Sequence, residues 1–345
     1  MYSTPRLMTI LIILTLLWII MLKKTTPKIS STTKELKTAA KTLKEGNKMK
    51  TASDDNTLMI DDTVSKKLMK KIRILCWITT VPGTLDSKAR AVNNTWAKRC
   101  DKTLFVLADD PSLPENTQKD ILRVKVPNGR DHLTAKTVQT LTYIHNHYLT
   151  QYDWFLKADD DTYIVMENLK FLLSHYNHRK PIYLGHLFKK YSKYGYMSGG
   201  AGYVLSRKAL RMLVKKGYRI PGKCREDGGD EDVALAHCLQ SVNIHVHSTV
   251  DKFGRESFLP FSGFAHVYGP MPPGLEEWDR NTPKIGSECC SQLLISFHYV
   301  KPDFMLMLEH LLYRTSVYGR KITEEGVRNL FKIGAVKPLT YSPKR

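Results

Sequence analysis

The chain has 345 residues, of which 42% are hydrophobic, 25% charged and 10% aromatic, and it carries a formal net charge of +20. These fractions are typical of globular proteins and exclude a collagen-like, a wholly disordered or a multi-spanning membrane chain. The positive charge suggests an anionic partner. The Lys and Arg residues are spread along the chain rather than gathered in a dense stripe with interleaved aromatics, so we do not expect a nucleic-acid partner.

Residues 7–22 form an uncharged, mostly apolar run that ends at Lys23 and Lys24. At about 1.5 Å per residue, a helix of this length spans roughly 24 Å, which is close to the hydrocarbon thickness of a thin early-secretory membrane. A cleaved signal peptide is the alternative, but no small-x-small cleavage site follows the run. We therefore expect an uncleaved transmembrane signal anchor at 7–22 after a short tail, residues 1–6. The flanking charges leave its orientation open.

Residues 23–70 are rich in Lys, Thr, Ser and Asp, and the first aromatic residue after them is Trp77. Such a segment cannot bury enough surface to offset the entropy of ordering it, so we expect a stalk there and a folded domain over 71–345. All six cysteines lie in that domain, without the Cys-x-x-Cys spacing of a zinc site. With an anchor and a stalk, they favour an oxidising, lumenal setting, although six cysteines allow fifteen pairings. Asn93 begins a formally valid glycosylation sequon.

The folded domain alternates strand-like and helical segments. Apolar, β-prone runs at 71–79, 103–108 and 154–157 are predicted strands, and residues 88–100 and 131–149 have the spacing of helices. This alternation is typical of an α/β domain with a largely parallel central sheet.

Three consecutive carboxylates, Asp159, Asp160 and Asp161, come directly after the third predicted strand. The carboxyl ends of parallel strands are where α/β sheets bind ligands. Asp159 and Asp161 alternate, so they can point the same way and chelate a hard divalent ion whose shell is completed by nucleotide phosphates. The alternative is a polar turn in which Asp161 caps a helix that begins near Ile164.

A glycine-rich run from Tyr196 to Ser206 places small residues between aromatic ones. Its glycines allow the backbone to approach a ligand closely, and Ser206 is placed to cap a following helix; a tight turn between strand and helix is the alternative. Glu231 and Asp232 precede a helical run, where they complement the helix dipole or provide a general base that deprotonates an acceptor hydroxyl. His298 lies in an apolar, strand-like stretch, which suits either a core residue or a metal ligand.

Together these segments resemble the core 1 β1,3-galactosyltransferase family, whose members transfer galactose from UDP-galactose to N-acetylgalactosamine on Ser or Thr. The resemblance rests on residues 154–163 (WFLKADDDTY), 197–206 (MSGGAGYVLS), Glu231-Asp232 and 289–300, where CCS is followed by SFHYV. It extends over about residues 72–320 and keeps the order of the motifs. It implies a GT-A-type nucleotide-diphospho-sugar glycosyltransferase domain, lumenal in a type II Golgi membrane protein, and a homodimer.

The resemblance also implies roles for single residues in an inverting, manganese-dependent transfer. Asp159, Asp161 and His298 would bind Mn²⁺, and Asp232 would be the base that activates the acceptor 3-hydroxyl. Residues implied at the UDP-galactose donor are Thr80, Pro82, Asp131, Lys136 and Asp160. Residues implied at the O-GalNAc glycoprotein acceptor are Tyr196, Gly199, Gly200, Glu231 and Trp278. The implied disulfides are Cys76–Cys100, Cys224–Cys238 and Cys289–Cys290.

The chain departs from the family pattern in three places. Val81 and Ala135 stand where the family has Gly and Trp near the donor segments, and Gly269–Glu288 keeps only Trp278 of an aromatic-dense acceptor loop. The donor and metal residues are therefore intact, whereas acceptor recognition is expected to differ.

Three alternative functions stay open. The first is a β1,3-glycosyltransferase with another acceptor such as fucose. The second is a non-catalytic lumenal chaperone for such an enzyme, and the third is a sugar-binding protein that transfers nothing. The chaperone known among the family's relatives lacks the aspartate triplet that this chain keeps as Asp159, Asp160 and Asp161. The triplet therefore favours an enzyme.

Overall fold

The computed structural model describes residues 62–109, 120–317 and 334. The chain divides into two compact units, residues 1–60 and 61–345, and all the described residues belong to the second. The expected tail, the anchor at 7–22 and most of the expected stalk lie outside the described residues. Within the described ranges, no helix is both long and apolar enough to cross a lipid bilayer.

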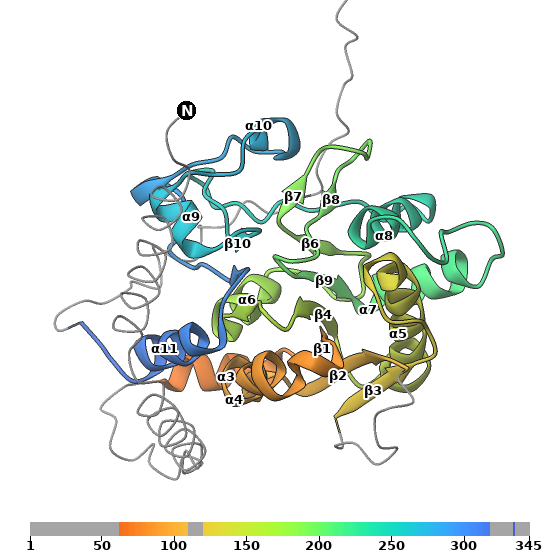
Figure 1. Cartoon of the computed structure of the whole chain (residues 1–345), viewed down its shortest axis with the longest axis horizontal. Coiled ribbons are helices and arrows are strands. Elements are labelled where there is room, and N and C mark those ends of the chain that lie inside the picture. Colours follow the sequence, from red (N-terminus) through yellow and green to blue (C-terminus); the bar gives the residue numbers. More distant parts are fainter. Residues whose placement is uncertain (1–61, 110–119, 318–333, 335–345) are drawn as a thin grey trace, which may run out of the picture. The chain divides into compact units, whose positions relative to one another are not determined.

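The second unit is built on a central sheet of six strands. They are β1 (Ile74–Thr79), β2 (Lys102–Ala108), β3 (Ile121–Val124), β4 (Trp154–Asp159), β6 (Tyr183–Gly185) and β9 (Tyr203–Ser206). Their order is β3-β2-β1-β4-β9-β6 (Figure 1). Strands β1 to β4 run parallel, and β9 is antiparallel to its neighbours β4 and β6. This confirms the predicted α/β class with a largely parallel sheet. The sequence pattern predicts β1, β2 and β4, and it does not predict β3 or β6.

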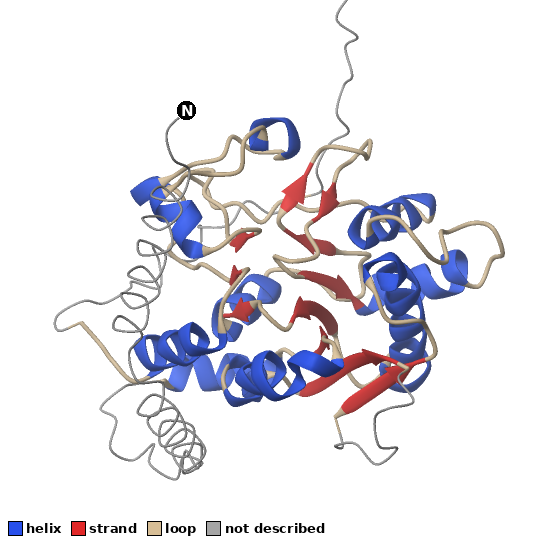
Figure 2. Cartoon of the chain, viewed as in Figure 1, coloured by secondary structure: helices blue, strands red, loops and turns tan. Residues whose placement is uncertain are grey.

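Helices cover both faces of the sheet (Figure 2) because successive residues of each strand point to opposite sides. In β1, Cys76 and Ile78 enter one core while Leu75 and Trp77 enter the other. The first core is covered by α3 (Thr63–Lys71), α4 (Arg90–Asn94), α6 (Met166–Ser174) and α11 (Pro302–Tyr313). The second is covered by α5 (Leu133–Tyr148), α7 (Arg207–Met212) and α8 (Glu231–Ser241). Helix α3 includes residues 63–70, at the end of the segment expected to be a stalk.

The helix predicted over 88–100 is broken into short pieces, whereas α5 fits its predicted range. A 3₁₀ turn (Pro82–Thr84) and a π-helical turn (Leu85–Ala89) precede α4, and a second 3₁₀ turn (Trp96–Arg99) follows it. The break lies at Thr95, whose backbone leaves the helical region with ψ of −113°. Its hydroxyl donates to the carbonyl of Ala91 at 2.7 Å, the competing hydrogen bond by which Thr ends or bends helices.

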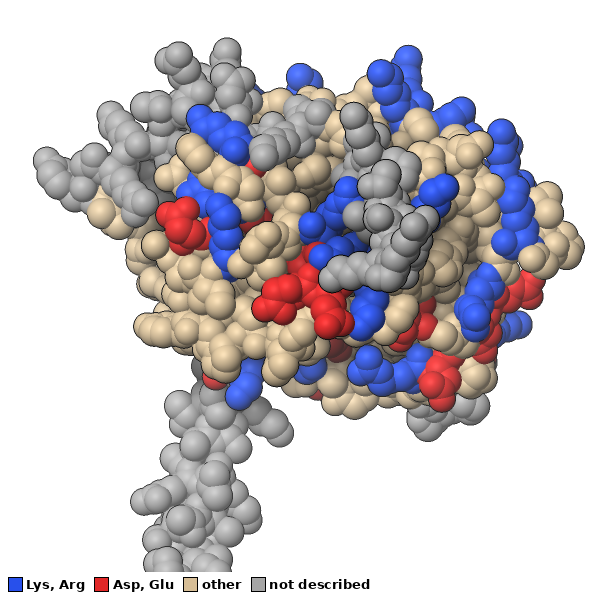
Figure 3. Space-filling model, turned by 90° about the horizontal axis from the view of Figure 1, so that it is seen from above, with Lys and Arg blue, Asp and Glu red and all other residues tan. Residues whose placement is uncertain are grey.

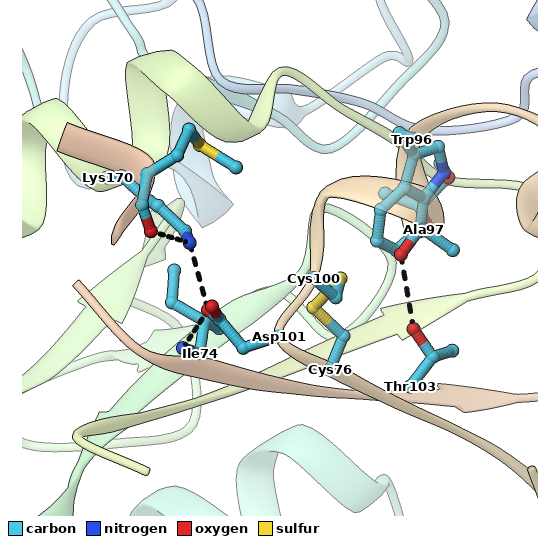
Figure 4. Close-up of a disulfide and its surroundings, with 10 residues drawn as sticks. Ile74, Cys76, Trp96, Ala97, Cys100, Asp101, Thr103 and Lys170 are labelled. Atoms are coloured by element: carbon cyan, nitrogen blue, oxygen red, sulfur yellow. Dashed lines mark hydrogen bonds and ion pairs between the residues drawn. A yellow bond between two sulfur atoms is a disulfide. The ribbon is translucent and has the colours of Figure 1, made fainter. Parts of the chain in front are cut away.

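Three disulfides join the pairs that the family resemblance implies, Cys76–Cys100, Cys224–Cys238 and Cys289–Cys290. The first links the middle of β1 to the residue after the second 3₁₀ turn, as Figure 4 shows. Beside it, Asp101 accepts a hydrogen bond from the N–H of Ile74 (2.7 Å) and pairs with the buried Lys170 of α6 (2.9 Å). These contacts hold the connection between α4 and β2 against β1.

A small second sheet brings a late part of the chain to the end of β4. Its strands are β5 (Tyr163–Ile164), β10 (Phe258–Leu259) and β11 (Ser296–Phe297), in the order β10-β11-β5. Strand β11 is antiparallel to β5, with Phe297 opposite Tyr163. The residue after β11 therefore lies beside the residues before β5. The described residues also form the hairpin β7 (Leu187–Phe188) with β8 (Tyr196–Met197), the helices α9 (Gly263–Tyr268) and α10 (Leu275–Trp278), a π-helical segment (Leu213–Tyr218), and 3₁₀ turns at Arg130–His132 and Gly286–Glu288.

On the face drawn in Figure 3, Lys and Arg side chains occur at many separate places, and several Asp and Glu side chains gather near its centre and at its lower right. Some of the exposed acids pair with them, such as Asp86 with Arg90 and Asp62 with Lys66. Exposed pairs of this kind contribute little to stability. The spread of charge that the sequence predicts is thus present on this face.

Candidate active site

The carboxyl ends of β1 and β4 open into a cleft of about 940 Å³, a volume typical of ligand sites. The cleft gathers most of the residues that the sequence singles out for metal, donor, acceptor and base roles. They are Thr80, Asp131, Asp159, Asp160, Asp161, Tyr196, Gly199, Gly200, Glu231, Asp232, Trp278 and His298. Pro82 and Lys136 do not line it. The ammonium of Lys136 lies behind Thr80 and donates to its carbonyl at 2.8 Å, and burial lowers the pKa of Lys136 to about 8.

Two carboxylates and one imidazole converge at the floor of this cleft. Asp159 is the last residue of β4, Asp161 lies in the turn to β5, and His298 directly follows β11. The Nε2 atom of His298 is 3.4 Å from Oδ1 of Asp161 and 4.0 Å from Oδ2 of Asp159. One ligand atom from each residue lies within 4.8 Å of the other two. The strand pairing, rather than any local pattern, brings His298 here.

The hydrogen bonds around these groups leave the atoms that face one another available. Nδ1 of His298 bonds to the carbonyl of Pro260 at 3.0 Å, so Nε2 is the ring nitrogen that faces the carboxylates. A second-sphere bond of this kind orients metal-binding histidines. Thr79 and Lys157 both bind Oδ1 of Asp159, which leaves its Oδ2 facing His298. Two carboxylates with one imidazole form a donor set that suits a divalent ion such as Mn²⁺, so the residues present fit a metal.

Asp161 does not cap a helix. Helix α6 begins at Met166 with Val165 at its N-cap, and β5 separates it from Asp161. The helix-cap alternative for Asp161 is therefore wrong, because two residues of strand come between the turn and the helix.

Buried and half-buried lysines balance the carboxylates. Lys157 of β4 lies 2.6 Å from Oδ1 of Asp159, and Lys88 lies 2.9 Å from Oδ2 of Asp161 and 3.8 Å from Oδ1 of Asp160. Burial by itself would raise the pKa of Asp161, but contacts with His298 and Lys88 outweigh it and hold that pKa well below its usual range. Lys157 outweighs burial at Asp159 and lowers its pKa. Both are thus ionised at neutral pH, as metal ligands must be.

Asp160 differs from its two neighbours. Its Oδ2 accepts hydrogen bonds from Thr80 at 2.7 Å and Thr84 at 2.5 Å. Burial raises the pKa of Asp160 despite these bonds. The middle aspartate therefore fastens the loop after β1, which carries Thr80, to the metal-binding turn.

The cleft is also lined by Glu231 and Asp232, in the first turn of α8. Oδ2 of Asp232 accepts the N–H of Gly199 at 2.9 Å, and burial raises the pKa of Asp232 although that bond and the N–H of Val233 oppose it. Glu231 accepts hydroxyl hydrogen bonds from Tyr203 (2.7 Å) and Thr137 (2.9 Å). The side chain of Glu231 is thus held by two other side chains, whereas Asp232 is held by backbone only and is the better placed of the two to accept a proton.

Gly200 leaves room for His298. A Cβ atom on Gly200 would overlap the imidazole ring of His298, whereas one on Gly83 would meet no atom within 4 Å. We therefore expect Gly200→Ala to displace His298 and to weaken metal-dependent nucleotide binding about tenfold or more. Calorimetric titration with UDP and Mn²⁺ checks this, with Gly83→Ala as the control. Unchanged metal-dependent affinity in Gly200→Ala would remove His298 from the metal-binding group.

Several residues of the cleft are not predicted from the sequence. Lys88, Lys157 and Thr84 contact the aspartates, and Lys157 alone has a visible signal, because a lysine in the middle of a buried strand needs a partner. The aromatic residues lining the cleft come from separate segments. They are Phe188, Tyr196, Phe261, Trp278 and Tyr299. These five residues are called the aromatic wall below, and all of them except Trp278 lie outside the shortened loop.

Comparison with known proteins agrees with this geometry. Residues 74–258 match the Fringe-like family. Glycoprotein-N-acetylgalactosamine 3-beta-galactosyltransferase 1 of Xenopus laevis is 41% identical over 264 residues, which cover 75% of this chain and 71% of that protein. Two relatives match over smaller shares. Chondroitin sulfate synthase 3 of Homo sapiens is 29% identical over 178 residues, which cover 47% of this chain and 20% of that protein. Beta-1,3-glucosyltransferase of Mus musculus is 27% identical over 202 residues, which cover 57% of this chain and 40% of that protein. The chain belongs to the Fringe-like family and, within it, to the core 1 β1,3-galactosyltransferases that its motifs resemble.

Proposed function

We propose that this chain is an inverting, manganese-dependent galactosyltransferase. It transfers galactose from UDP-galactose to the 3-hydroxyl of N-acetylgalactosamine O-linked to Ser or Thr. The observation that carries the proposal is the presence in one cleft of a metal-binding group (Asp159, Asp161, His298) and of a half-buried carboxylate of raised pKa, Asp232.

The donor lies on the floor of the cleft in this proposal. Asp159, Asp161 and His298 hold Mn²⁺, which when bound neutralises the diphosphate of the leaving UDP. Thr80, Asp131 and Asp160 line the donor side. The two donor residues outside the cleft, Pro82 and Lys136, act on the loop after β1. Lys136 does so through its hydrogen bond to Thr80.

Asp232 serves as the base. Its Oδ2, held by the N–H of Gly199, takes the proton of the acceptor 3-hydroxyl as that oxygen bonds to the anomeric carbon of galactose. The bond from that carbon to the UDP oxygen breaks at the same time, on the opposite face, so the configuration inverts. Lys157 donates to Oδ1 of Asp159 at 2.6 Å and to the carbonyl of Gly199 at 2.9 Å, so it links the metal-binding group to the backbone that binds Asp232.

The rate of transfer is expected to fall in acid because Asp232 must be ionised to accept the proton. Burial raises the pKa of Asp232 above its usual value, so the rate rises with pH through that raised pKa and is constant above it. Measuring kcat at saturating substrates from about pH 4 to pH 8 checks this against the usual aspartate pKa of about 4. A kcat that stays constant to the acid end would contradict the role of Asp232.

The acceptor binds on the side of Tyr196, Gly199, Gly200, Glu231 and Trp278. Aromatic rings are well suited to pack on the apolar face of a sugar. The shortened loop leaves Trp278 as its only aromatic residue, but Phe188 and Tyr196 lie on the same cleft. They restore an aromatic surface that an N-acetylgalactosamine-bearing peptide can contact.

An acceptor panel tests this function against its rivals. The purified protein is given UDP-galactose and Mn²⁺ with a peptide bearing N-acetylgalactosamine and, in parallel, with acceptors ending in fucose or other core sugars. We expect transfer to the N-acetylgalactosamine peptide. Transfer only to another sugar would assign a different β1,3-glycosyltransferase. Binding of UDP and Mn²⁺ without any transfer would assign a sugar-binding protein, and neither binding nor transfer a chaperone.

The cellular setting follows from the same proposal. The apolar run at 7–22 serves as a signal anchor, residues 1–6 face the cytoplasm, and the catalytic unit lies in the Golgi lumen as a homodimer. Three disulfides support an oxidising compartment for the catalytic unit.

A further inference from the structure

A second cluster of titratable side chains lies apart from the metal-binding group. His186, between β6 and β7, is fully buried, and the carboxylates of Glu256 and Asp279 beside it are also buried. Nδ1 of His186 is 3.1 Å from the carbonyl of Phe258 and 3.3 Å from Oε2 of Glu256. Nε2 is 3.4 Å from Oδ2 of Asp279. No step of the proposed transfer uses these groups.

The charge of this cluster requires a cation. Two buried carboxylates around a neutral imidazole would be strongly unfavourable. Burial by itself would lower the pKa of His186, but Asp279 and Glu256 outweigh it and raise that pKa to about 10. His266 of α9 also faces the cluster, and burial together with the charge of His186 lowers the pKa of His266 to about 4, so it stays neutral.

A metal ion fits this cluster less well than an imidazolium. Glu256 approaches Nδ1, which already faces the carbonyl of Phe258, and Asp279 approaches Nε2. One ligand atom from each of the three residues lies within 4.8 Å of the other two, as in the metal-binding group, but the two carboxylates lie nearest to different ring nitrogens. A doubly protonated ring serves both.

The cluster is attached to the segments that carry Trp278 and Phe188, two residues of the proposed acceptor side that are called the acceptor wall below. Asp279 directly follows Trp278, whose carbonyl accepts the N–H of Lys189 at 2.6 Å, and Asp279 itself bridges to Phe188 of β7. The ring of Phe188 packs edge-on against His186 with centroids 4.8 Å apart. Glu256 accepts the side-chain amide of Asn281 at 2.7 Å. Both aromatic residues that line the cleft here, Trp278 and Phe188, are thus adjacent to the cluster.

We propose that His186 is a positioning residue, a buried imidazolium that holds Asp279 and Glu256 so that Trp278 and Phe188 keep the acceptor wall formed. The inference rests on the proposed function, because it assigns that wall to the acceptor. It goes beyond the proposed function, since His186 contacts neither the metal-binding group nor the base. With one aromatic residue left in the loop, the anchoring of Trp278 becomes decisive for acceptor affinity.

Kinetics of the purified full-length protein test the positioning role. We expect His186→Gln to raise the acceptor KM about tenfold while kcat and the UDP affinity with Mn²⁺ change less than about twofold. His186→Arg, which keeps a cation able to reach both carboxylates, is expected to restore most of the acceptor affinity. Asp279→Asn should lower the acceptor affinity less in the His186→Gln background than in the wild type, because the two residues act as one unit. Equal losses of UDP and acceptor affinity in His186→Gln would overturn the proposal.

A second measurement does not depend on transfer. In protein labelled with fluorotryptophan, the Trp278 resonance, assigned with Trp278→Phe, is expected to shift or broaden in His186→Gln, while those of the core residues Trp77, Trp96 and Trp154 stay in place. An unchanged Trp278 resonance in His186→Gln would overturn the positioning role of His186. Absence of galactose transfer by the wild type would instead count against the proposed function alone. A metal ion retained by Asp161→Asn and lost on adding His186→Gln would replace the imidazolium with a second metal site and overturn it as well.

Discussion

Asp232→Asn is expected to abolish galactose transfer while leaving the affinity for UDP and Mn²⁺ nearly unchanged. The amide keeps the size of the side chain but cannot take the proton of the acceptor hydroxyl, and loss of a general base lowers kcat by about 10²- to 10⁴-fold. Among the described residues, the side chain of Asp232 makes no hydrogen bond to a member of the metal-binding group. Its side-chain hydrogen bonds go to the N–H groups of Gly199 and Val233, and an amide oxygen can still accept one of these.

The control for Asp232→Asn is Glu226→Gln, which removes a carboxylate from the exposed segment just before α8. We expect its kcat to match the wild type. Transfer is followed with a peptide bearing N-acetylgalactosamine, and UDP binding is measured by calorimetry on the same preparations. A fall in UDP affinity as large as the fall in rate would show that Asp232 is not the base.

The second large effect is expected from Asp161→Asn, which should weaken metal-dependent UDP binding by about 100-fold and abolish transfer at low Mn²⁺. The substitution removes one of two anionic ligands and leaves Asp159 and His298 as the remaining group. It also removes the charge that faces Lys88 at 2.9 Å. Raising the Mn²⁺ concentration should restore part of the binding, because the loss is one of metal affinity.

Asp86→Asn is the matched control, because Asp86 is highly exposed and, within the part of the chain that the structure describes, pairs with Arg90 alone. Both variants are titrated with UDP at several Mn²⁺ concentrations and again with EDTA. If Asp161→Asn kept the metal dependence of the wild type, Asp161 would not be a ligand and the metal-binding group would have to be reassigned.

The sequence predicts the framework of the sheet well, because β1, β2 and β4 are continuous apolar runs that are buried on both faces. It predicts the helix over 131–149 because the apolar residues there recur at helical spacing. It does not predict the break at Thr95, which depends on one side chain that bonds back to Ala91. The short strands β5, β10 and β11 have two residues each, too few for any periodicity to indicate them.

In the site, too, the residues that follow a strong local pattern are predicted from the sequence, and those placed by contacts between distant segments are not. Asp159 and Asp161 are recognisable because they follow a strong strand signal. His298 in an apolar stretch suits a core residue and a ligand equally, and only its pairing partner β5 decides between them. The aromatic wall is the least accessible feature, since Phe188, Tyr196 and Trp278 come from segments whose proximity depends on the whole fold. The change at the acceptor side is therefore smaller than the loss of aromatic residues from Gly269–Glu288 suggests.

One cleft is expected to perform metal-dependent transfer of galactose to N-acetylgalactosamine. This is tested by incubating the purified protein with UDP-galactose, Mn²⁺ and a peptide bearing N-acetylgalactosamine, with and without EDTA. We expect a galactosylated peptide that is absent when EDTA is present and reappears when Mn²⁺ is restored in excess. Transfer that persists in EDTA would contradict the role of the metal-binding group. Absence of transfer from a protein that binds UDP and Mn²⁺ would contradict the assignment of the acceptor.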